Sequence, residues 1–531
     1  MLFRSELANM IGPNYRSMSN FEFFNLSEPL NPEDQTRVLG TQLQSQPSLV
    51  LKHVEDDFLR LIHAIRHRKG RPRLQAQHSL SHLPPEAKPY TYALQVPLER
   101  VADVAKQLRS TDLVVDAIEL IIDLDILLAN KDGLDQSAAT FITRQYYMLR
   151  RNVKLPVIFH VQGQGLGENG KWSTYFDILF HGLRLAPEYL TLDLSCDHTR
   201  AKALMAQKIS TKVIGHVFDT EPCDNAWDSP GRFMMLQVAQ ELGCELVRIC
   251  QPSLSAEDNV SVQHFIFRAK RSGISIPVIA YNTGRVGRAS CFANSVLSPV
   301  THDLLRSGAH TRTEQMLTVQ AAQKALYASF ALDKLVFGIF GSAVTAAMSP
   351  VMHNAAFEFC GMPHVYQTFQ SSSLSDLKYL VYSENFGGAS ISSPFKREIL
   401  SVLEYVSPEA QAIGAVNTLV PLRSRGLESL VDRNHAGPVA ALFGDNTDWI
   451  GIHTSIRRHL SPVNAVKSGT TALILGAGGM AQAAVYACLR LGVQTVFIYN
   501  RTTENARKLV NQFDGRSFLL HNIDLDRASP S

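Results

Sequence analysis

Short apolar, β-branched runs recur between residues 91 and 284, and they constrain the fold of this chain more than any other feature. They are TYALQVPL (91–98), LVVDAIELIIDLD (113–125), LPVIFHVQG (155–163), YLTLDLS (189–195), TKVIGHVFD (211–219), CELVRICQ (244–251) and IPVIAYNTG (276–284). Segments with helical periodicity, such as SAATFITRQYYMLRRN (137–152), separate several of these runs. Alternation of this kind predicts a parallel sheet, and seven or eight units in ~240 residues predict a closed (β/α)8 barrel.

The functional side chains of such a barrel lie at the carboxyl ends of its strands. Site residues are therefore expected around positions 119–125, 160–163, 216–219, 248–251 and 282–291.

The remaining segments suggest further domains, since a chain of 531 residues at ~150 residues per domain predicts three or four. Residues 1–89 are predicted to be a polar tail, a helix and a linker, followed by the barrel at 90–325. The helix, KHVEDDFLRLIHAI (52–65), has one apolar face and is expected to stand alone, without a packing partner. A second αβ segment at 330–465 precedes a partial nucleotide-binding domain at 466–531.

Composition excludes several classes of protein. The formal net charge is only +3, and the one basic cluster, HAIRHRKGRPR (63–73), is more typical of a solvated helix end and linker than of a nucleic-acid arm. Seven scattered cysteines without a C-x-x-C pair predict no metal site and indicate a reducing, intracellular compartment, cytoplasmic or nuclear. No signal peptide or membrane-spanning run is found in the sequence.

Polar residues among turns are concentrated between Gly387 and Asp448, in GGASISSPFKREIL (387–400), AIGAVNTLV (412–420) and GDNTDWIG (444–451). The two glycines at 387–388 allow close approach of the backbone. Lys396, Asn417 and Asp448 form a set suited to proton transfer to and from a hydroxyl or carbonyl. Each segment alone is more typical of a capped turn with exposed charges, but the three in order, followed by a nucleotide-binding pattern, favour a site.

A nucleotide-binding pattern follows in TALILGAGGMAQAAVYACLRLGVQTVFIYNRT (471–502), which predicts a strand, a glycine-rich turn, a helix and a strand. An NAD site would have an acidic residue after the second strand, whereas Arg501 suits the 2′-phosphate of NADP. The predicted cofactor-binding residues are Gly476, Gly478, Gly479, Ala481, Asn500, Arg501 and Thr502. The sequence stops short of the second half of a doubly wound sheet, so weak NADP binding is expected.

Residues 335–531 resemble shikimate dehydrogenases, because Ser349-Pro350, SISSPFK, GAVNT, GDNTD, GAGG and NRT occur in the order of that family. The resemblance implies that Lys396 and Asp448 are the catalytic pair. It also implies that shikimate is bound by Ser349, Ser392 and Asn417. Ala347 replaces a second carboxylate-binding Ser, Ser392 replaces a Thr, and the closing segment with a further substrate-binding Gln is absent.

Residues 90–325 resemble type I 3-dehydroquinate dehydratases, barrels that work through a Schiff-base lysine and a histidine. Matching the strands in order implies that Arg248 occupies the lysine position and Phe218 the histidine position, with His216 two residues away. The substrate-binding arginines of the family are replaced by Ile121, Gln162 and Cys291, whereas Glu119 and Gln315 match. Guanidinium does not deprotonate in proteins, so dehydratase activity is expected to be absent.

The order of these domains resembles the fungal pentafunctional polypeptide of aromatic biosynthesis, and the helix at 52–65 resembles only the tail of its kinase domain. A barrel with lost catalytic residues resembles the fungal quinate repressor family. That resemblance implies a regulator that binds a quinate- or shikimate-pathway metabolite and a transcription activator. No helix-turn-helix, zinc or basic-arm signature predicts direct contact with DNA, and no membrane contact is expected.

Two alternatives remain open. The chain is either an NADP-dependent shikimate dehydrogenase fused to an inactive or residual dehydratase barrel, or a degraded or wrongly bounded gene product without a stable C-terminal domain. The retained Lys396, Asn417 and Asp448 favour the enzyme over decay, whereas Ala347 and the missing C-terminal half count against turnover.

Overall fold

The computed structural model describes residues 19–24, 54, 57–62, 64–65, 83–111, 113–128, 133–163, 171–221, 226–306, 316–426, 433–460, 464–467, 469–513 and 519–522. The chain forms two compact units. One contains Pro84–Ala325 with the segments Met1–Ser45 and Lys52–Gln75, and the other contains Leu326–Ser531 with two short earlier segments.

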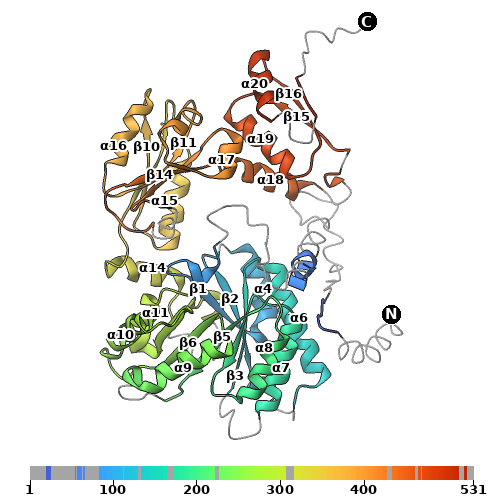
Figure 1. Ribbon diagram of the computed structural model, residues 1–531, viewed down its shortest axis with the longest axis vertical. Helices are drawn as coiled ribbons and strands as arrows, with labels where there is room; N and C mark the ends of the chain where they lie inside the picture. Colours follow the sequence, from blue (N-terminus) through green and yellow to red (C-terminus); the bar gives the residue numbers. More distant parts are fainter. Residues whose placement is uncertain are drawn as a thin grey trace. The chain divides into compact units, whose positions relative to one another are not determined.

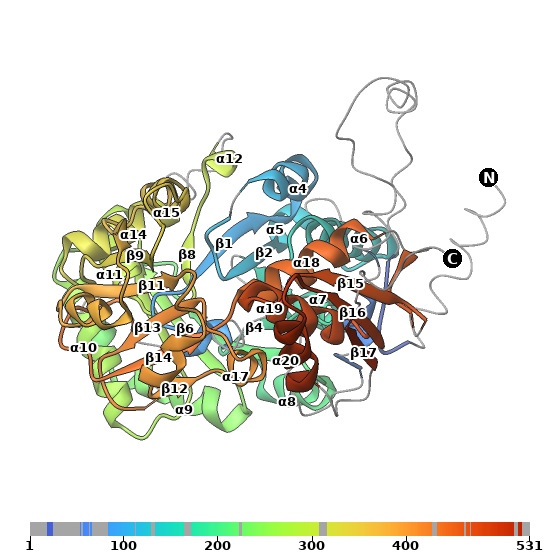
Figure 2. The same ribbon diagram turned by 90° about the horizontal axis from the view of Figure 1, so that it is seen from above.

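The first unit is the predicted (β/α)8 barrel, nearly closed (Figures 1 and 2). Its strands are β1 (Tyr92–Pro97), β2 (Ala117–Asp123), β3 (Val157–Gln162), β4 (Tyr189–Asp193), β5 (Lys212–Phe218), β6 (Leu246–Pro252), β7 (Val278–Thr283) and β8 (Ser298–Val300). All neighbouring pairs are parallel, in the order β7-β6-β5-β4-β3-β2-β1-β8. Seven of these strands coincide with the apolar runs of the sequence, and only the short β8 lies outside them.

A ring of helices covers the outer surface of the strands (Figure 1). It comprises α4 (Val101–Ser110), α5 (Leu124–Leu127), α6 (Gln136–Asn152), α7 (Trp172–Arg184), α8 (His198–Gln207), α9 (Pro230–Leu242), α10 (Asp258–Arg271), α11 (Gly284–Ala293), α12 (Asp303–Arg306) and α14 (Val319–Ala328). Local signals fix their ends: the Asp135 carboxylate accepts from the Ala138 amide at the start of α6. At the end of α9, Gly243 takes the left-handed conformation with φ 81°.

Side chains on the strands alternate between the helix-facing core and the barrel interior. The lowest interior layer is apolar and includes Ala93, Ala117, Ile158, Ile214 and Ile279. Residues two positions further along each strand point to the same side. The next interior layer therefore carries polar residues, and it is described with the site below.

The helix predicted at 52–65 was expected to lack a partner, and that expectation is wrong. Its residues Leu61 and Ala64 are buried against Ala186 and against Phe21 and Phe23 from the N-terminal segment. Polar contacts add to this packing, since Arg60 Nη1 donates to the Ala186 carbonyl at 2.7 Å. The helix belongs to the barrel unit because its apolar face packs against residues of that unit.

The second unit contains a six-stranded sheet in the order β10-β9-β11-β13-β14-β12 (Figure 1). Its strands are β9 (Val336–Gly341), β10 (Val365–Gln370), β11 (Phe386–Ile391), β12 (Tyr405–Val406), β13 (Thr418–Leu422) and β14 (Ala441–Asp445). Helices α15 (Ser349–Cys360), α16 (Leu377–Val381), α17 (Pro408–Ile413) and α18 (Asp448–His459) connect or follow them. Only β13 runs antiparallel to its neighbours β11 and β14.

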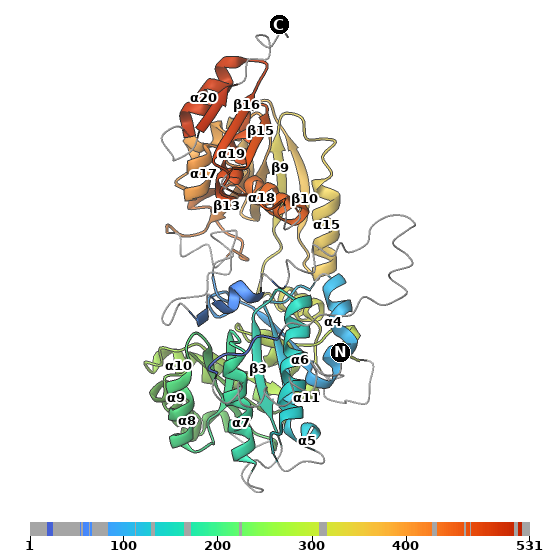
Figure 3. The ribbon, with the colours of Figure 1, turned by 90° about the vertical axis from the view of Figure 1, so that its right-hand side faces the viewer.

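A second, three-stranded parallel sheet carries the predicted nucleotide-binding pattern (Figure 3). It consists of β15 (Thr471–Leu475), β16 (Thr495–Tyr499) and β17 (Leu519–Asn522), with α19 (Gly479–Arg490) and α20 (Thr503–Phe513) as crossovers. Helix α19 also packs against α17 and α18, which ties the two sheets of this unit together. Within the described ranges, no helix is long and apolar enough to cross a membrane.

Candidate functional site

The middle layer of the barrel interior is a ring of polar side chains, one from each of strands β1 to β7. These are Gln95, Glu119, His160, Thr191, His216, Arg248 and Tyr281. All but Gln95 are buried, and Glu119 has no exposed surface. A buried polar group is costly unless it finds partners, so the contacts within this ring decide whether the layer is stable.

Arg248 supplies most of those contacts. Its Nη1 donates to Glu119 Oε1 at 2.6 Å, its Nε donates to His216 Nδ1 at 3.1 Å, and its Nη2 lies 3.2 Å from His160 Nδ1. Gln95 donates to the second oxygen of Glu119 at 3.0 Å. The guanidinium therefore extends from β6 across the barrel to β2 and occupies the middle of the interior.

The charges of this ring are mutually compensated. Burial alone would raise the pKa of Glu119, but the positive charge of Arg248, the neighbouring His160 and the hydrogen bonds from Gln95 and Arg248 together outweigh burial, and the pKa is lowered. Burial and the same guanidinium lower the pKa of His160 to about 4 and that of His216 well below its usual range. Both imidazoles are therefore neutral at pH 7, and the ring has one anion and one cation in direct contact.

Arg248 itself cannot perform amine chemistry. A Schiff base requires an amine that loses its proton and attacks a carbonyl, and the Arg248 guanidinium keeps its proton in an ion pair with Glu119. The neighbouring His216 Nδ1 already accepts from Arg248.

The remaining barrel positions singled out in the sequence lie in several places. Ile121 and Gln162 lie in the layer above the ring, and the Gln162 amide donates to Asp123 at 3.1 Å, across the ends of β3 and β2. Phe218 ends β5 and is 40% exposed. Cys291 lies on α11 against the apolar interior layer, and Gln315 lies outside the described residues.

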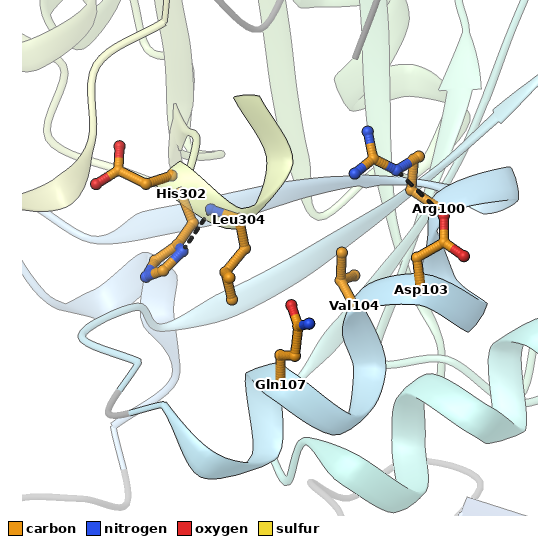
Figure 4. Close-up of a pocket in the computed structure, with 7 residues that line it drawn as sticks. Arg100, Asp103, Val104, Gln107, His302 and Leu304 are labelled. Carbon is orange, nitrogen blue, oxygen red and sulfur yellow. Dashed lines mark hydrogen bonds and ion pairs between the residues drawn. The ribbon is translucent and has the colours of Figure 1, made fainter. Parts of the chain in front are cut away.

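A cavity of about 400 Å³ opens near the carboxyl ends of β1 and β8, but it lies apart from the ring (Figure 4). Arg100, Val104 and Gln107 form one wall, and His302 and Leu304 form the other. None of the predicted site residues lines this cavity. Within the described part of the chain, no group of three or more His, Cys, Asp and Glu side chains could hold a metal ion.

In the second unit, the three side chains singled out in the sequence meet. Lys396 Nζ lies 2.6 Å from Asp448 Oδ2, and Asn417 Nδ2 donates to Asp448 Oδ1 at 2.8 Å. Lys396 and Asp448 side chains keep 19% and 15% of their surface exposed. Unlike the barrel ring, this group can be reached by a ligand, and Lys396 retains donors beyond the one directed at Asp448.

Sheet topology explains this convergence. Strands β11 and β14 end at the same edge of the sheet, and the antiparallel strand β13 begins there. Lys396 therefore follows β11, Asn417 precedes β13 and Asp448 follows β14. The Thr447 amide donates to Asn417 Oδ1 at 2.8 Å, which fixes the orientation of the Asn417 amide.

The two other substrate residues predicted in this unit also lie near this edge. Ser349 begins α15, after Ala347, and Ser392 follows β11. Within the described residues, neither serine hydroxyl has a hydrogen-bond partner. The close approach at Gly387 serves packing, because a Cβ there would lie 2.5 Å from the Phe337 ring.

The turn between β15 and α19 fits the phosphates of a dinucleotide. Gly476 has φ 114°, a conformation that strains any other residue, and a Cβ at Gly476 or Gly478 would meet nothing within 4 Å. Helix α19 begins directly after this turn, at Gly479, and its N-cap makes no side-chain hydrogen bond, so the amides of its first turn are suited to bind a phosphate. Ala481 is buried in the helix–sheet core.

Two of the remaining predicted cofactor residues contact each other. Asn500 Nδ2 donates to the Thr502 carbonyl at 2.8 Å, which shapes the turn after β16. Arg501 between them is exposed. Its guanidinium is therefore accessible to a phosphate.

Several residues of the two sites were not identified from the sequence, namely Gln95, Thr191 and Tyr281 in the ring and Thr447 beside Asn417, whereas His160 begins the expected range 160–163. Strand alternation was the available signal for the ring, because each member lies two residues after an interior apolar residue. Glu119, for example, follows the buried Ala117.

Family comparisons agree with this architecture. The type I 3-dehydroquinase family matches residues 92–333, the shikimate dehydrogenase substrate binding domain matches 339–419, and the shikimate / quinate 5-dehydrogenase family matches 462–527. A curated relative, the quinate repressor protein of Emericella nidulans, is 41% identical over 94% of the chain. The chain is similar to the fungal quinate repressors.

A second quinate repressor protein, from Talaromyces stipitatus, is 32% identical over 94% of the chain. The chain spans 58% and 56% of the lengths of these two repressors. The pentafunctional AROM polypeptide of Mycosarcoma maydis is 34% identical over 80% of the chain, which covers 24% of that polypeptide. Among solved structures, dehydroquinate dehydratase and shikimate dehydrogenase from S. pombe AroM has a TM-score of 0.67 at 28% identity, covering 83% of this chain and 79% of its own.

Proposed function

We propose that this chain is a quinate-repressor-like regulator that senses a quinate- or shikimate-pathway metabolite and binds a transcription activator inside the cell. The observation that carries the proposal is the buried Arg248–Glu119 ion pair. It lies where the resemblance to dehydratases implies a nucleophilic lysine. The polar edge of the second unit retains Lys396, Asn417 and Asp448. Loss of amine chemistry together with a retained binding site suits a sensor.

In this proposal the metabolite binds at the Lys396–Asp448 pair. Lys396 would donate to a ligand hydroxyl or carbonyl, and Asp448 would accept from a hydroxyl, with the Asn417 amide holding Asp448 in place. Ser349 and Ser392 offer hydroxyls to the ligand carboxylate, and Ala347 offers none.

A metabolite can act as a switch only if it binds the free and the activator-bound chain with different affinities. The test is a pull-down of the transcription activator by the full chain, with and without quinate or shikimate. We expect the metabolite to weaken the complex. An activator complex that is indifferent to every pathway metabolite, or salt-sensitive binding of this chain to promoter DNA, would contradict the proposal.

The second candidate is an NADP-dependent shikimate dehydrogenase, favoured by the 2.6 Å contact between Lys396 and Asp448. When bound, NADP would supply the hydride acceptor, held by the turn at Gly476–Gly479 and by Arg501. Lys396 and Asp448 would then move the proton of the substrate hydroxyl. An assay of NADP⁺ reduction with shikimate separates this enzyme from the regulator, because the regulator should give no turnover.

A further inference from the structure

Two glutamine side chains tie the nucleotide-binding sheet of the second unit to its polar edge. Gln482 on α19 is 2% exposed, and its Nε2 donates to Gln512 Oε1 on α20 at 2.7 Å. Gln512 Nε2 in turn donates to the carbonyl of Ile413, the last residue of α17, at 2.6 Å. These helices meet where the two sheets join (Figure 3). The glutamine pair therefore links three helices by side-chain hydrogen bonds.

On one side of the glutamine pair lies the segment that leads to the metabolite residues. Gly414 begins it with φ 72°, and a Cβ there would lie 2.8 Å from Gln512 Nε2. A side chain at this position would push the Gln512 amide away, so glycine permits the contact. Two residues further, the Val416 amide donates to the Lys396 carbonyl at 2.7 Å, and Asn417 follows. A shift of this segment therefore reaches both Lys396 and Asn417.

On the other side of the glutamine pair lies the nucleotide-binding turn. The backbone amide of Gln482 donates to the Gly478 carbonyl at 3.1 Å, so Gln482 belongs to the first turn of α19. The turn also approaches the metabolite residues directly. A Cβ at Gly479 would lie 3.6 Å from Lys396 Cδ and 3.7 Å from Ala415 Cβ, which is ordinary van der Waals contact. The start of α19 therefore lies beside the Lys396 side chain.

Coupling between two sites requires an element that can take two arrangements. Gln482 meets this requirement, because its Oε1 is buried and has no hydrogen-bond partner among the described residues. A buried acceptor without a partner is unfavourable. The arrangement of the pair described here leaves one hydrogen bond unmade, so an alternative arrangement of the Gln482 amide costs little.

We propose that the glutamine pair couples the two sites, so that NADP or NADPH bound at Gly476–Gly479 strengthens binding of the metabolite at Lys396. Phosphate held at the first turn of α19 would fix Gln482 and, through Gln512, the segment that leads to Asn417. The metabolite then meets a site that is already ordered and loses less free energy in ordering it. The inference rests on the proposed function for the metabolite site, and it adds a second ligand that regulates this site.

The test is isothermal calorimetry of shikimate binding to the full chain, with and without saturating NADPH. NADPH is chosen because it cannot accept a hydride from shikimate, so no turnover disturbs the titration. We expect NADPH to tighten shikimate binding about fivefold or more. Because coupling is reciprocal, shikimate should tighten NADPH binding by the same factor.

Two variants test the role of the glutamine pair. Gln482→Met keeps the length of the side chain and removes its polar atoms, and Gln512→Ala removes both hydrogen bonds of the tie. Each should bind shikimate alone and NADPH alone within about twofold of the unaltered chain, and each should lose the coupling between them. A merely structural role would instead lower the melting temperature or the affinity for a single ligand.

The matched control is Asn511→Ala, which removes an exposed amide next to Gln512 on α20. It should retain the coupling of the unaltered chain, because no hydrogen bond of the tie involves Asn511.

Equal shikimate affinity with and without bound NADPH, absence of NADPH binding, or full coupling in both glutamine variants would overturn the inference. In each of these cases the proposed function stands if shikimate or quinate still binds and weakens the activator complex. If neither metabolite binds the full chain, with or without NADPH, the proposed function itself fails.

Discussion

The Nη1 atom of Arg248 lies 2.6 Å from Oε1 of Glu119, although the two residues belong to strands β6 and β2 on opposite sides of the barrel. The resemblance to type I dehydroquinases implies a lysine at this position, which would have to supply a neutral amine. Arg248 supplies instead a permanent cation that neutralises the one buried carboxylate of the ring. The ion pair thus accounts for how this ring of buried polar side chains is stabilised.

Removing one partner of this pair should destabilise the barrel. Arg248→Met leaves Glu119 buried without its counter-ion, and we expect a loss of about 3–5 kcal/mol in the free energy of unfolding. The double variant Arg248→Met with Glu119→Leu should recover most of that loss, because no charge then remains unpaired. Urea unfolding in a Trp449→Phe background reports on the barrel alone, since Trp172 and Trp227 are the other tryptophans.

The control for this series is Arg306→Met, which breaks an exposed pair with Asp303 at 3.5 Å. It should change stability by less than about 1 kcal/mol. If Arg248→Met lost no more stability than Arg306→Met, the buried pair would not hold the ring together. A double variant less stable than either single variant would show the same.

Stability of the barrel should fall in mild acid. Burial and Arg248 lower the pKa of His160 from 6.5 to about 4, so the unfolded chain binds this proton more readily than the folded chain does. The unfolding free energy is therefore highest above about pH 6.5 and decreases as the pH falls towards 4, by roughly 3 kcal/mol for this group. The lowered pKa of Glu119 acts in the same direction.

The measurement is urea unfolding at several pH values between 4 and 7.5, again in the Trp449→Phe background. His160→Gln removes the titrating group and should reduce the slope of stability against pH. A slope that is the same with and without His160 would assign the acid sensitivity to other residues.

The barrel should form no covalent adduct with a substrate. When the chain is incubated with 3-dehydroquinate and reduced with borohydride, mass spectrometry should find the unmodified mass. Arg248→Lys should also give no turnover, because an ammonium at this position would remain paired with Glu119 and the other family positions carry Ile121, Gln162 and Phe218. A trapped adduct on the unaltered chain would contradict the loss of amine chemistry, and an active type I dehydroquinase provides the positive control.

Much of this architecture was predictable from the sequence, because the strands of the barrel are long and β-branched. Strand β8 was harder to identify, since Ser298–Val300 is too short to show a pattern. The packing of the N-terminal helix was missed for a different reason. Its partners, Phe21 and Phe23, lie in a short segment without periodicity, and Ala186 is distant in the sequence.

The two sites also differed in how far the sequence could predict them. Lys396, Asn417 and Asp448 each follow or precede a strand, so their convergence at one sheet edge could be expected once the strands were known. The contact between Arg248 and Glu119 depends on the width of the barrel and on the length of one arginine. Neither property is visible in the local pattern around CELVRIC or AIELIID.

Binding of a metabolite by the second unit should depend on Lys396. Lys396→Ala removes the donor closest to Asp448, and we expect affinity for shikimate or quinate to fall roughly 10–100-fold, as for loss of a charged hydrogen bond. Isothermal calorimetry on the full chain measures the change. Lys378→Ala, an exposed lysine on α16, is the matched control and should bind normally. Equal affinity of Lys396→Ala and the unaltered chain would place the metabolite elsewhere.

Nucleotide binding should be weak and should favour NADP over NAD. The turn at Gly476 leaves open space for a pyrophosphate, but the strands described beside it form only the three-stranded sheet β15-β16-β17. Arg501 is the only residue of the turn after β16, Asn500–Thr502, that carries a charge, and it suits a 2′-phosphate. Arg501→Ser should therefore abolish the preference while leaving NAD binding unchanged.

Calorimetry with NADP and NAD on the full chain checks this expectation. Arg507→Ser is the control, because Arg507 is exposed on α20, one helical turn into the crossover, and should not contact the 2′-phosphate. If Arg507→Ser loses the preference as fully as Arg501→Ser, a general basic surface attracts the extra phosphate. Equal or tighter binding of NAD by the unaltered chain would show that Arg501 does not select the nucleotide, because its charge can favour only the ligand that carries the 2′-phosphate.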